Sequence, residues 1–79
     1  MNIYLCSQWE NRGYDTYDSF VCVANSEDEA RSTLPSSYFD WDENPRDWCE
    51  SPDKVDVTLL GKANEDQVAG VICSSYNAG

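Results

Sequence analysis

The chain has 79 residues, of which 15 are acidic and five are basic, and it has no histidine and a formal net charge of −10. This length fits a single small domain, residues 1–79, with a thin hydrophobic core. The hydrophobic fraction of 41%, with three Trp, five Tyr and two Phe, argues against disorder. The negative charge argues against binding to nucleic acid or to an anionic membrane, and it favours a basic partner.

The composition gives little support for catalysis. Without histidine, the commonest general base and metal ligand is missing. The sequence also contains no phosphate-binding glycine loop and no nucleophile motif. Because 15 acidic residues make a chance pair of carboxylates inevitable, such a pair does not indicate a glycosidase. We therefore expect a non-enzymatic protein that needs no cofactor.

Two strands are expected in the first third of the chain. Residues 3–9 (IYLCSQW) are rich in β-forming residues. Residues 10–18, with Gly13 and two Tyr-Asp pairs, are typical of a loop or of the wide end of a hairpin. Residues 19–24 (SFVCVA) are apolar on both faces, so they predict a central, covered strand.

A short helix is expected over residues 26–34. Ser26 and Glu29 have the spacing of a capping box, in which each side chain satisfies a free backbone N–H group. Acidic residues in the first turn suit the positive end of the helix dipole. Pro35 blocks continuation of the helix.

The chain after residue 53 predicts a β-hairpin. Residues 54–63 alternate apolar and polar side chains, which is the pattern of a half-buried strand. Residues 64–66 (NED) then form a turn, and residues 67–75 form a fourth strand that pairs with the third. The predicted order is ββαββ, an α+β fold with a four-stranded, mostly antiparallel sheet, one short helix and a long aromatic-acidic loop.

That loop, residues 35–53, holds all three prolines and six of the 15 acidic residues. Long loops in small domains are usually functional or disordered, and the aromatic residues argue against disorder. Because tryptophan favours burial, we expect aromatic side chains to anchor the loop and to hold its carboxylates in fixed places. The expected anchors are Tyr38, Phe39, Trp41 and Trp48.

Two acidic clusters are the candidate partner-binding residues. Alternate residues of an extended segment project about 7 Å apart on one face, which is comparable to the separation of neighbouring phosphates in a DNA strand. A protein whose basic side chains bind phosphates would also bind such carboxylates. The candidates are Asp40, Asp42, Glu43, Asp47, Glu50 and Asp53 in the loop, and Glu10, Asp15 and Asp18 near the N-terminus, where Tyr14 and Tyr17 alternate with them.

No metal site is expected. Asp40, Asp42 and Asn44 match three ligand positions of an EF-hand loop, but Pro45 replaces the required glycine and Ser51 the final glutamate. Zinc is also not indicated, because the sequence has no Cys-x-x-Cys pair and no histidine.

The four cysteines are expected to be thiols. The first nine residues lack the basic segment and apolar run of a signal peptide. No segment approaches the roughly 20 apolar residues of a membrane span. We therefore expect a cytoplasmic protein, and disulfides are rare in that compartment. Cys6, Cys22 and Cys73 each lie in an apolar run, which predicts structural packing.

Three stretches of the chain resemble a group of small uncharacterised proteins of phages and prophages. The pattern in those proteins is Gly-Tyr-Asp-x-Tyr-Asp, then Ser-Glu-x-Glu-Ala-Arg, a Val-x-Val strand and an Asn-Ala-Gly end. The matching stretches here are GYDTYDSFVCVANSEDEAR, SPDKVDVTLLGKA and GVICSSYNAG, which cover 42 of the 79 residues and omit residues 32–50. The resemblance implies a phage protein that acts in the cytoplasm of the bacterial host, and it implies no catalytic residue.

Small acidic phage proteins often antagonise host defence, and in function this chain resembles the small acidic anti-CRISPR proteins. We therefore expect a monomeric inhibitor that binds the basic nucleic-acid-binding surface of a Cas effector subunit. It would block recognition of target DNA and its PAM by DNA mimicry. The alternatives are a DNA-mimic inhibitor of RNA polymerase or a restriction enzyme, a non-inhibitory phage interaction module that uses exposed aromatics, and an acidic surface that serves solubility alone.

Overall fold

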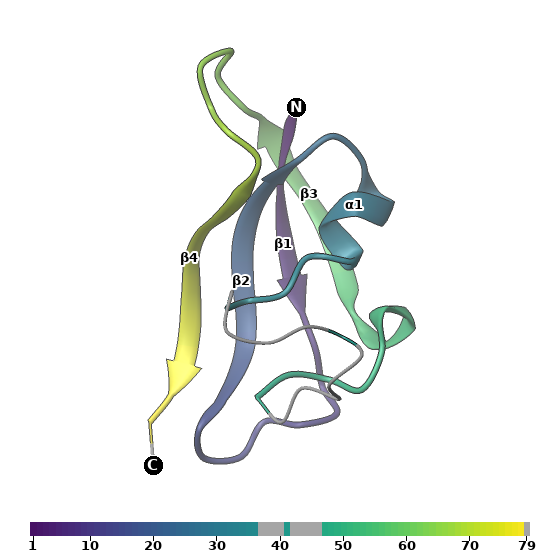
Figure 1. The fold of residues 1–79 in the computed structure, drawn as a ribbon, viewed down its shortest axis with the longest axis vertical. Helices are drawn as coiled ribbons and strands as arrows, with labels where there is room; N and C mark the ends of the chain where they lie inside the picture. Colours follow the sequence, from purple (N-terminus) through teal and green to yellow (C-terminus); the bar gives the residue numbers. More distant parts are fainter. Residues whose placement is uncertain (37–40, 42–46, 79) are drawn as a thin grey trace.

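A four-stranded antiparallel sheet is the main element of the computed structural model, which describes residues 1–36, 41 and 47–78 (Figure 1). The sheet has the order β3-β1-β2-β4, with β1 and β2 in its centre. α1 is a short α-helix after β2, and η2 is one turn of 3₁₀ helix before β3. These findings confirm the α+β class and the antiparallel four-stranded sheet. The bounds are β1 Asn2–Ser7, β2 Thr16–Ala24, α1 Glu27–Arg31, η2 Pro52–Lys54, β3 Asp56–Lys62 and β4 Gly70–Asn77.

The predicted hairpin between the third and fourth strands is wrong. β3 pairs with β1 at one edge of the sheet, whereas β4 pairs with β2 at the other edge. The connection over residues 63–69 passes the open end of the β1–β2 hairpin, opposite the turn that joins these two strands (Figure 1). Three interstrand spacings amount to about 14 Å, and seven extended residues reach up to about 23 Å. The connection is therefore long enough to cross the sheet, and the NED turn inside it does not join neighbouring strands.

Several element boundaries also differ from the expected ones. Residues 16–18 belong to β2 and not to a loop, because Tyr17 pairs with Tyr76 of β4, with ring centroids 4.8 Å apart. The Ser26 side chain accepts from the Glu29 N–H (3.1 Å), so the predicted N-cap is present. The helix is shorter than expected because Thr33 N–H donates to the Ala30 carbonyl, a tighter closing turn than an α-helix makes.

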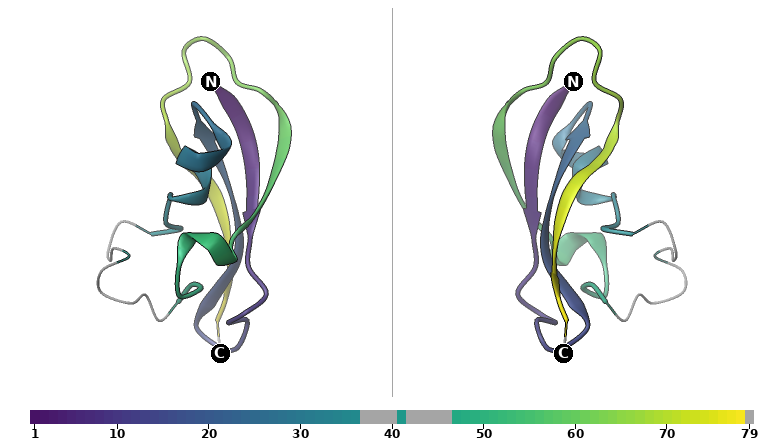
Figure 2. Two further views of the ribbon diagram at one scale, coloured as in Figure 1. Left: turned by 90° about the vertical axis from the view of Figure 1, so that its right-hand side faces the viewer. Right: turned by 90° about the vertical axis from the view of Figure 1, so that its left-hand side faces the viewer.

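The hydrophobic core lies on one face of the sheet. α1 and the segment that leads to η2 cover that face, and no element of the described residues covers the opposite one (Figure 2). Side chains at alternate positions of β1 and β2 point into the core, as the strand period of two requires. A helix of five residues covers little of the sheet, so Trp48 fills much of the remaining space. The buried core cluster consists of Tyr4, Cys6, Phe20, Cys22, Ala24, Ala30, Trp48, Cys49 and Val55.

All four cysteines are thiols, and three of them are buried. The prediction of structural packing agrees with the positions of Cys6 and Cys22 and is wrong for Cys73, which is exposed because it lies on the edge strand β4. Burial raises the pKa of the Cys6 thiol to about 12 and that of Cys49 to about 11. Burial also raises the pKa of Cys22. The folded protein therefore holds these three thiols in the neutral form.

None of the helices in the described ranges has the length and apolar character needed to cross a membrane.

We expect the protein to lose stability as the pH rises above about 8.5, where thiols of the unfolded chain begin to ionise. The folded thiols keep their protons up to about 11 for Cys49 and 12 for Cys6. The stabilisation from these neutral thiols is complete below the thiol pKa of the unfolded chain. It is lost as the pH rises from that pKa through the higher thiol pKa values of the folded protein. Denaturant titrations at several alkaline pH values measure this slope. Cys49→Ala should flatten the slope by about 1.4 kcal/mol per pH unit.

Cys73→Ala is the matched control, because it removes an exposed thiol and should leave the slope unchanged. A wild-type slope that Cys49→Ala does not alter would contradict the buried position of this thiol.

Candidate partner-binding site

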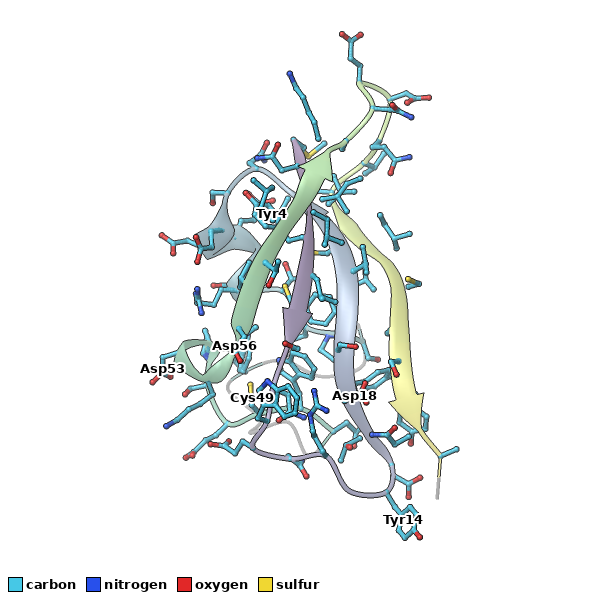
Figure 3. All side chains as sticks on the ribbon, turned by 180° about the vertical axis from the view of Figure 1, so that it is seen from behind. Tyr4, Tyr14, Asp18, Cys49, Asp53 and Asp56 are labelled. Atoms are coloured by element: carbon cyan, nitrogen blue, oxygen red, sulfur yellow. The ribbon has the colours of Figure 1, made fainter. Side chains whose placement is uncertain are left out.

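Acidic residues from separate parts of the chain meet at one end of the sheet, which we call the acidic end. The turn between β1 and β2, the segment 47–54 and the last residues of β4 all lie there (Figures 1 and 3). Tyr14 and Asp18 lie near the end of β4, and Asp53 lies beside the start of β3 (Figure 3). The acidic end comprises Glu10, Asp15, Asp18, Asp47, Glu50, Asp53 and Asp56.

The structure brings six of the nine predicted partner-binding residues to this end. Asp40, Asp42 and Glu43 lie outside the described residues, as do the expected anchors Tyr38 and Phe39. Asp56 was not among the sequence candidates, because its alternation with Val55 and Val57 indicated only the solvent side of a strand.

A buried glutamine organises the turn between β1 and β2. Gln8 has no exposed surface, and its amide uses both its donor and its acceptor ends. Its Nε2 donates to the carbonyls of Tyr17 (2.9 Å) and Asn11, and its Oε1 accepts from the N–H groups of Glu10 (2.9 Å) and Asn11 (2.7 Å). The Gln8 carbonyl also accepts from Arg12 Nε (2.7 Å). One side chain therefore fixes the backbone of Glu10 and Asn11 to that of Tyr17.

Three hydrogen bonds join this turn and β2 to the segment that begins at residue 47. Asn11 Nδ2 donates to the Trp48 carbonyl (3.2 Å), and the Glu50 N–H donates to Glu10 Oε1 (2.9 Å). The Tyr17 N–H donates to the Asp47 carbonyl (2.7 Å). The described residues of the two predicted acidic clusters, far apart in sequence, are thus joined at one end of the sheet.

The two expected anchors that the structure describes take different positions. Trp48 is 1% exposed, and its ring packs against Phe20 with centroids 5.2 Å apart. Its Nε1 is buried without a hydrogen-bond partner. Trp41 is half-buried against the core, and its Nε1 donates to the Ser32 carbonyl (2.8 Å). Trp48 therefore connects Asp47 and Glu50 directly to the core.

An open hollow of about 680 Å³ borders the acidic end. The Tyr76 hydroxyl donates to Asp15 Oδ1 (3.3 Å) at this hollow, and Asp15 has a left-handed backbone (φ 59°), a conformation that Asp tolerates better than most residues. Beside it, the Arg12 guanidinium stacks on the exposed Trp9 ring, 3.6 Å from its centroid. The lining residues are Arg12, Gly13, Tyr14, Asp18, Tyr76, Asn77 and Ala78.

Two side chains at the acidic end, Tyr76 and Asp53, have shifted pKa values. Partial desolvation and the nearby Asp15 carboxylate raise the pKa of the Tyr76 phenol. The hydrogen bond from the Ser51 hydroxyl lowers the pKa of the Asp53 carboxyl, so Asp53 stays ionised at neutral pH. Across residues 1–36, 41 and 47–78, no group of three metal-ligating side chains forms a metal site. The arrangement can attract and orient basic groups.

Comparison with known protein families, characterised proteins and solved structures finds no match to this chain.

Sequence reasoning missed Gln8, Asn11, Trp9 and Tyr76 as parts of this site. No local sequence pattern shows whether a glutamine that follows a strand, such as Gln8, is buried or exposed. The Tyr76 contribution depends on the β2–β4 pairing, which the sequence analysis did not predict.

We expect Gln8→Leu to destabilise the protein by about 3 kcal/mol, because several backbone groups lose their partners in a buried site and each costs roughly 1–3 kcal/mol. Denaturant unfolding measures the change. Gln67→Leu is the matched control at an exposed loop position, and there the cost should be below about 0.5 kcal/mol. Equal costs for both variants would contradict the role assigned to Gln8.

Proposed function

We propose that this protein is a phage-encoded acidic inhibitor that binds the basic nucleic-acid-binding surface of a host protein by DNA mimicry. The partner we propose is a subunit of a Cas effector complex in the cytoplasm of the bacterial host, where the inhibitor would block recognition of the PAM and target DNA. The same mechanism applied to RNA polymerase or a restriction enzyme is the nearest alternative. The protein acts without a cofactor and contacts neither nucleic acid nor membrane.

The observation that carries the proposal is the fixed position of the acidic end. Gln8 and Trp48 hold two acidic segments on the folded body, and the Glu10–Glu50 hydrogen bond joins them. A preordered array of carboxylates loses less conformational entropy on binding than a flexible acidic tail does. Solubility alone does not require this order, because a disordered acidic segment would serve equally well.

Few of the described residues at the acidic end are basic. Arg12 stacks on Trp9, and Lys54 adjoins Asp53. In the described ranges, the salt bridge present joins Arg31 to Glu27 (2.7 Å) on α1, away from this end. The carboxylates therefore keep their negative potential available to an incoming basic surface, which raises the association rate.

The phage assignment rests on the motifs quoted above, residues 13–18 and 26–31 in particular. A sequence without histidine or a catalytic motif favours inhibition by occupancy over inhibition by chemistry.

A non-inhibitory interaction module is the second candidate, and the exposed aromatic residues favour it. Trp9 is 71% exposed, Tyr14 81% and Tyr76 47%. Tyr14 and Tyr76 line the hollow at the acidic end, and Trp9 stacks against Arg12, which also lines it. Aromatic residues are common anchors of protein interfaces. Salt dependence separates the two functions, because charge-driven binding weakens strongly with salt and aromatic docking does not.

We expect the double variant Asp47→Lys, Glu50→Lys to lose binding to the partner captured by the wild-type protein from host lysate. Both side chains lie on the acidic end, and their backbone groups remain available for the existing hydrogen bonds. Binding of the purified partner should fall by at least about 100-fold, since reversed charges at a charged interface cost several kcal/mol. Nucleic acid should compete with the wild-type protein for the same partner.

The matched control is Glu65→Lys, Asp66→Lys, in the connection at the other end of the sheet. Both double variants change the net charge from −10 to −6, since each substitution adds two positive units. Equal losses of binding would show that only total charge matters, and wild-type binding by the first variant, folded by circular dichroism, would reject the acidic end as the binding surface.

A further inference from the structure

The edge strand β4 lies in the longest uncharged part of the chain. Residues 67–79 contain no acidic or basic side chain, although 20 of the 79 residues are charged. The β4 residues Val71, Ile72 and Tyr76 are 38%, 52% and 47% exposed, and Val68 just before the strand is 82% exposed. An exposed apolar strand without charge is the kind of edge that natural proteins usually protect.

The other edge of the sheet is protected in that way. β3 begins with Asp56 and ends with Lys62, and charged residues on edge strands oppose pairing with further strands. β4 has no such residue, and within the described chain only β2 pairs with it. The outward backbone groups of β4 are therefore available to another strand.

We propose that two copies of this protein pair through β4, edge to edge and antiparallel, to form a continuous eight-stranded sheet. A symmetric contact uses the same surface patch of both copies. On a chain of charge −10, a contact through any acidic surface would therefore bring carboxylates together. Two copies that meet through β4 avoid repulsion between carboxylates, because β4 has no charged side chain.

The antiparallel arrangement also follows from the charge distribution. The acidic end lies at the C-terminal end of β4, where Tyr76 donates to Asp15. A parallel pair would set two acidic ends side by side. The antiparallel pair sets each acidic end beside the partner's 63–69 connection, which has only Glu65 and Asp66. The two acidic ends then face outward at opposite ends of the dimer, and both remain open for the proposed basic partner.

A second copy fits this edge better than a basic partner does. A basic partner binds more tightly where carboxylates are present, and β4 has no carboxylate side chain, whereas the acidic end has seven. Pairing between two copies is favoured where carboxylates are absent, because the two chains then repel each other less. The two contacts therefore respond to salt in opposite directions, so this inference and the proposed function fail or succeed separately.

The test is sedimentation equilibrium of the wild-type protein in reducing buffer at low and high NaCl. Screening of the repulsion between the two chains should tighten the dimer by about tenfold or more between 0.1 M and 1 M salt, where the Debye length falls from about 10 Å to about 3 Å. A monomer under all conditions, as the sequence alone led us to expect, would overturn the inference. So would a dimer that weakens as salt rises.

Two matched variants locate the contact. Ser75→Lys places a charge on the β4 edge, and Thr58→Lys places the same charge on the β3 edge, and both positions are exposed. Each variant reduces the negative charge of the chain from −10 to −9, which by itself favours association. Ser75→Lys should abolish the dimer, and Thr58→Lys should keep it. The reverse pattern, or equal loss in both, would overturn the assignment to β4.

Hydrogen exchange of the wild-type protein gives a readout that needs no variant. The outward amides of residues 71–77 should become protected as protein concentration and salt rise, since pairing buries them in new hydrogen bonds. Dimerisation without new protection in β4 would overturn the inference even if Ser75→Lys does not fold.

Discussion

The structure depends on the filling of a one-sided core by Trp48. The sheet offers one face for burial, and α1, with five residues, covers little of it. Trp48 and Cys49 complete the cover against Phe20 and the central strands. Removal of a buried tryptophan typically costs about 3–5 kcal/mol, a large part of the 5–15 kcal/mol that holds a typical domain folded. The chain therefore cannot form this core without also bringing Asp47 and Glu50 to the body.

This constraint explains how an acidic chain keeps its carboxylates in place against their mutual repulsion. The segment at Trp48 meets the turn that Gln8 organises, and neutral groups make most of the connecting hydrogen bonds. The exception is Glu10, whose carboxylate accepts from the Glu50 N–H. Because backbone and amide groups hold the two segments together, the remaining carboxylates are available at the surface. Core packing and surface charge are in this sense one property of the fold.

The sequence predicted the central strands, the N-cap of the helix and the burial of Cys6 and Cys22, because each depends on local pattern or local composition. It did not predict the pairing of β4, because the choice between a hairpin and a crossing connection depends on competition between strands that no local pattern records. The exposure of Cys73 follows from that choice. It named six of the seven residues of the acidic end, but as members of two separate clusters. Gln8 and Asn11, which join the two segments, act through contacts that only the folded chain defines.

The central claim is that the acidic end is part of the cooperative folded body. Native-state hydrogen exchange tests it at two amides, those of Glu50 and Tyr17, which donate to Glu10 Oε1 and to the Asp47 carbonyl. The account predicts that both amides exchange only through large openings, with free energies close to those of core amides in β1 and β2. Exchange of both at the rate of an unprotected loop, while the core amides stay protected, would show that the acidic segments are not fixed to the body.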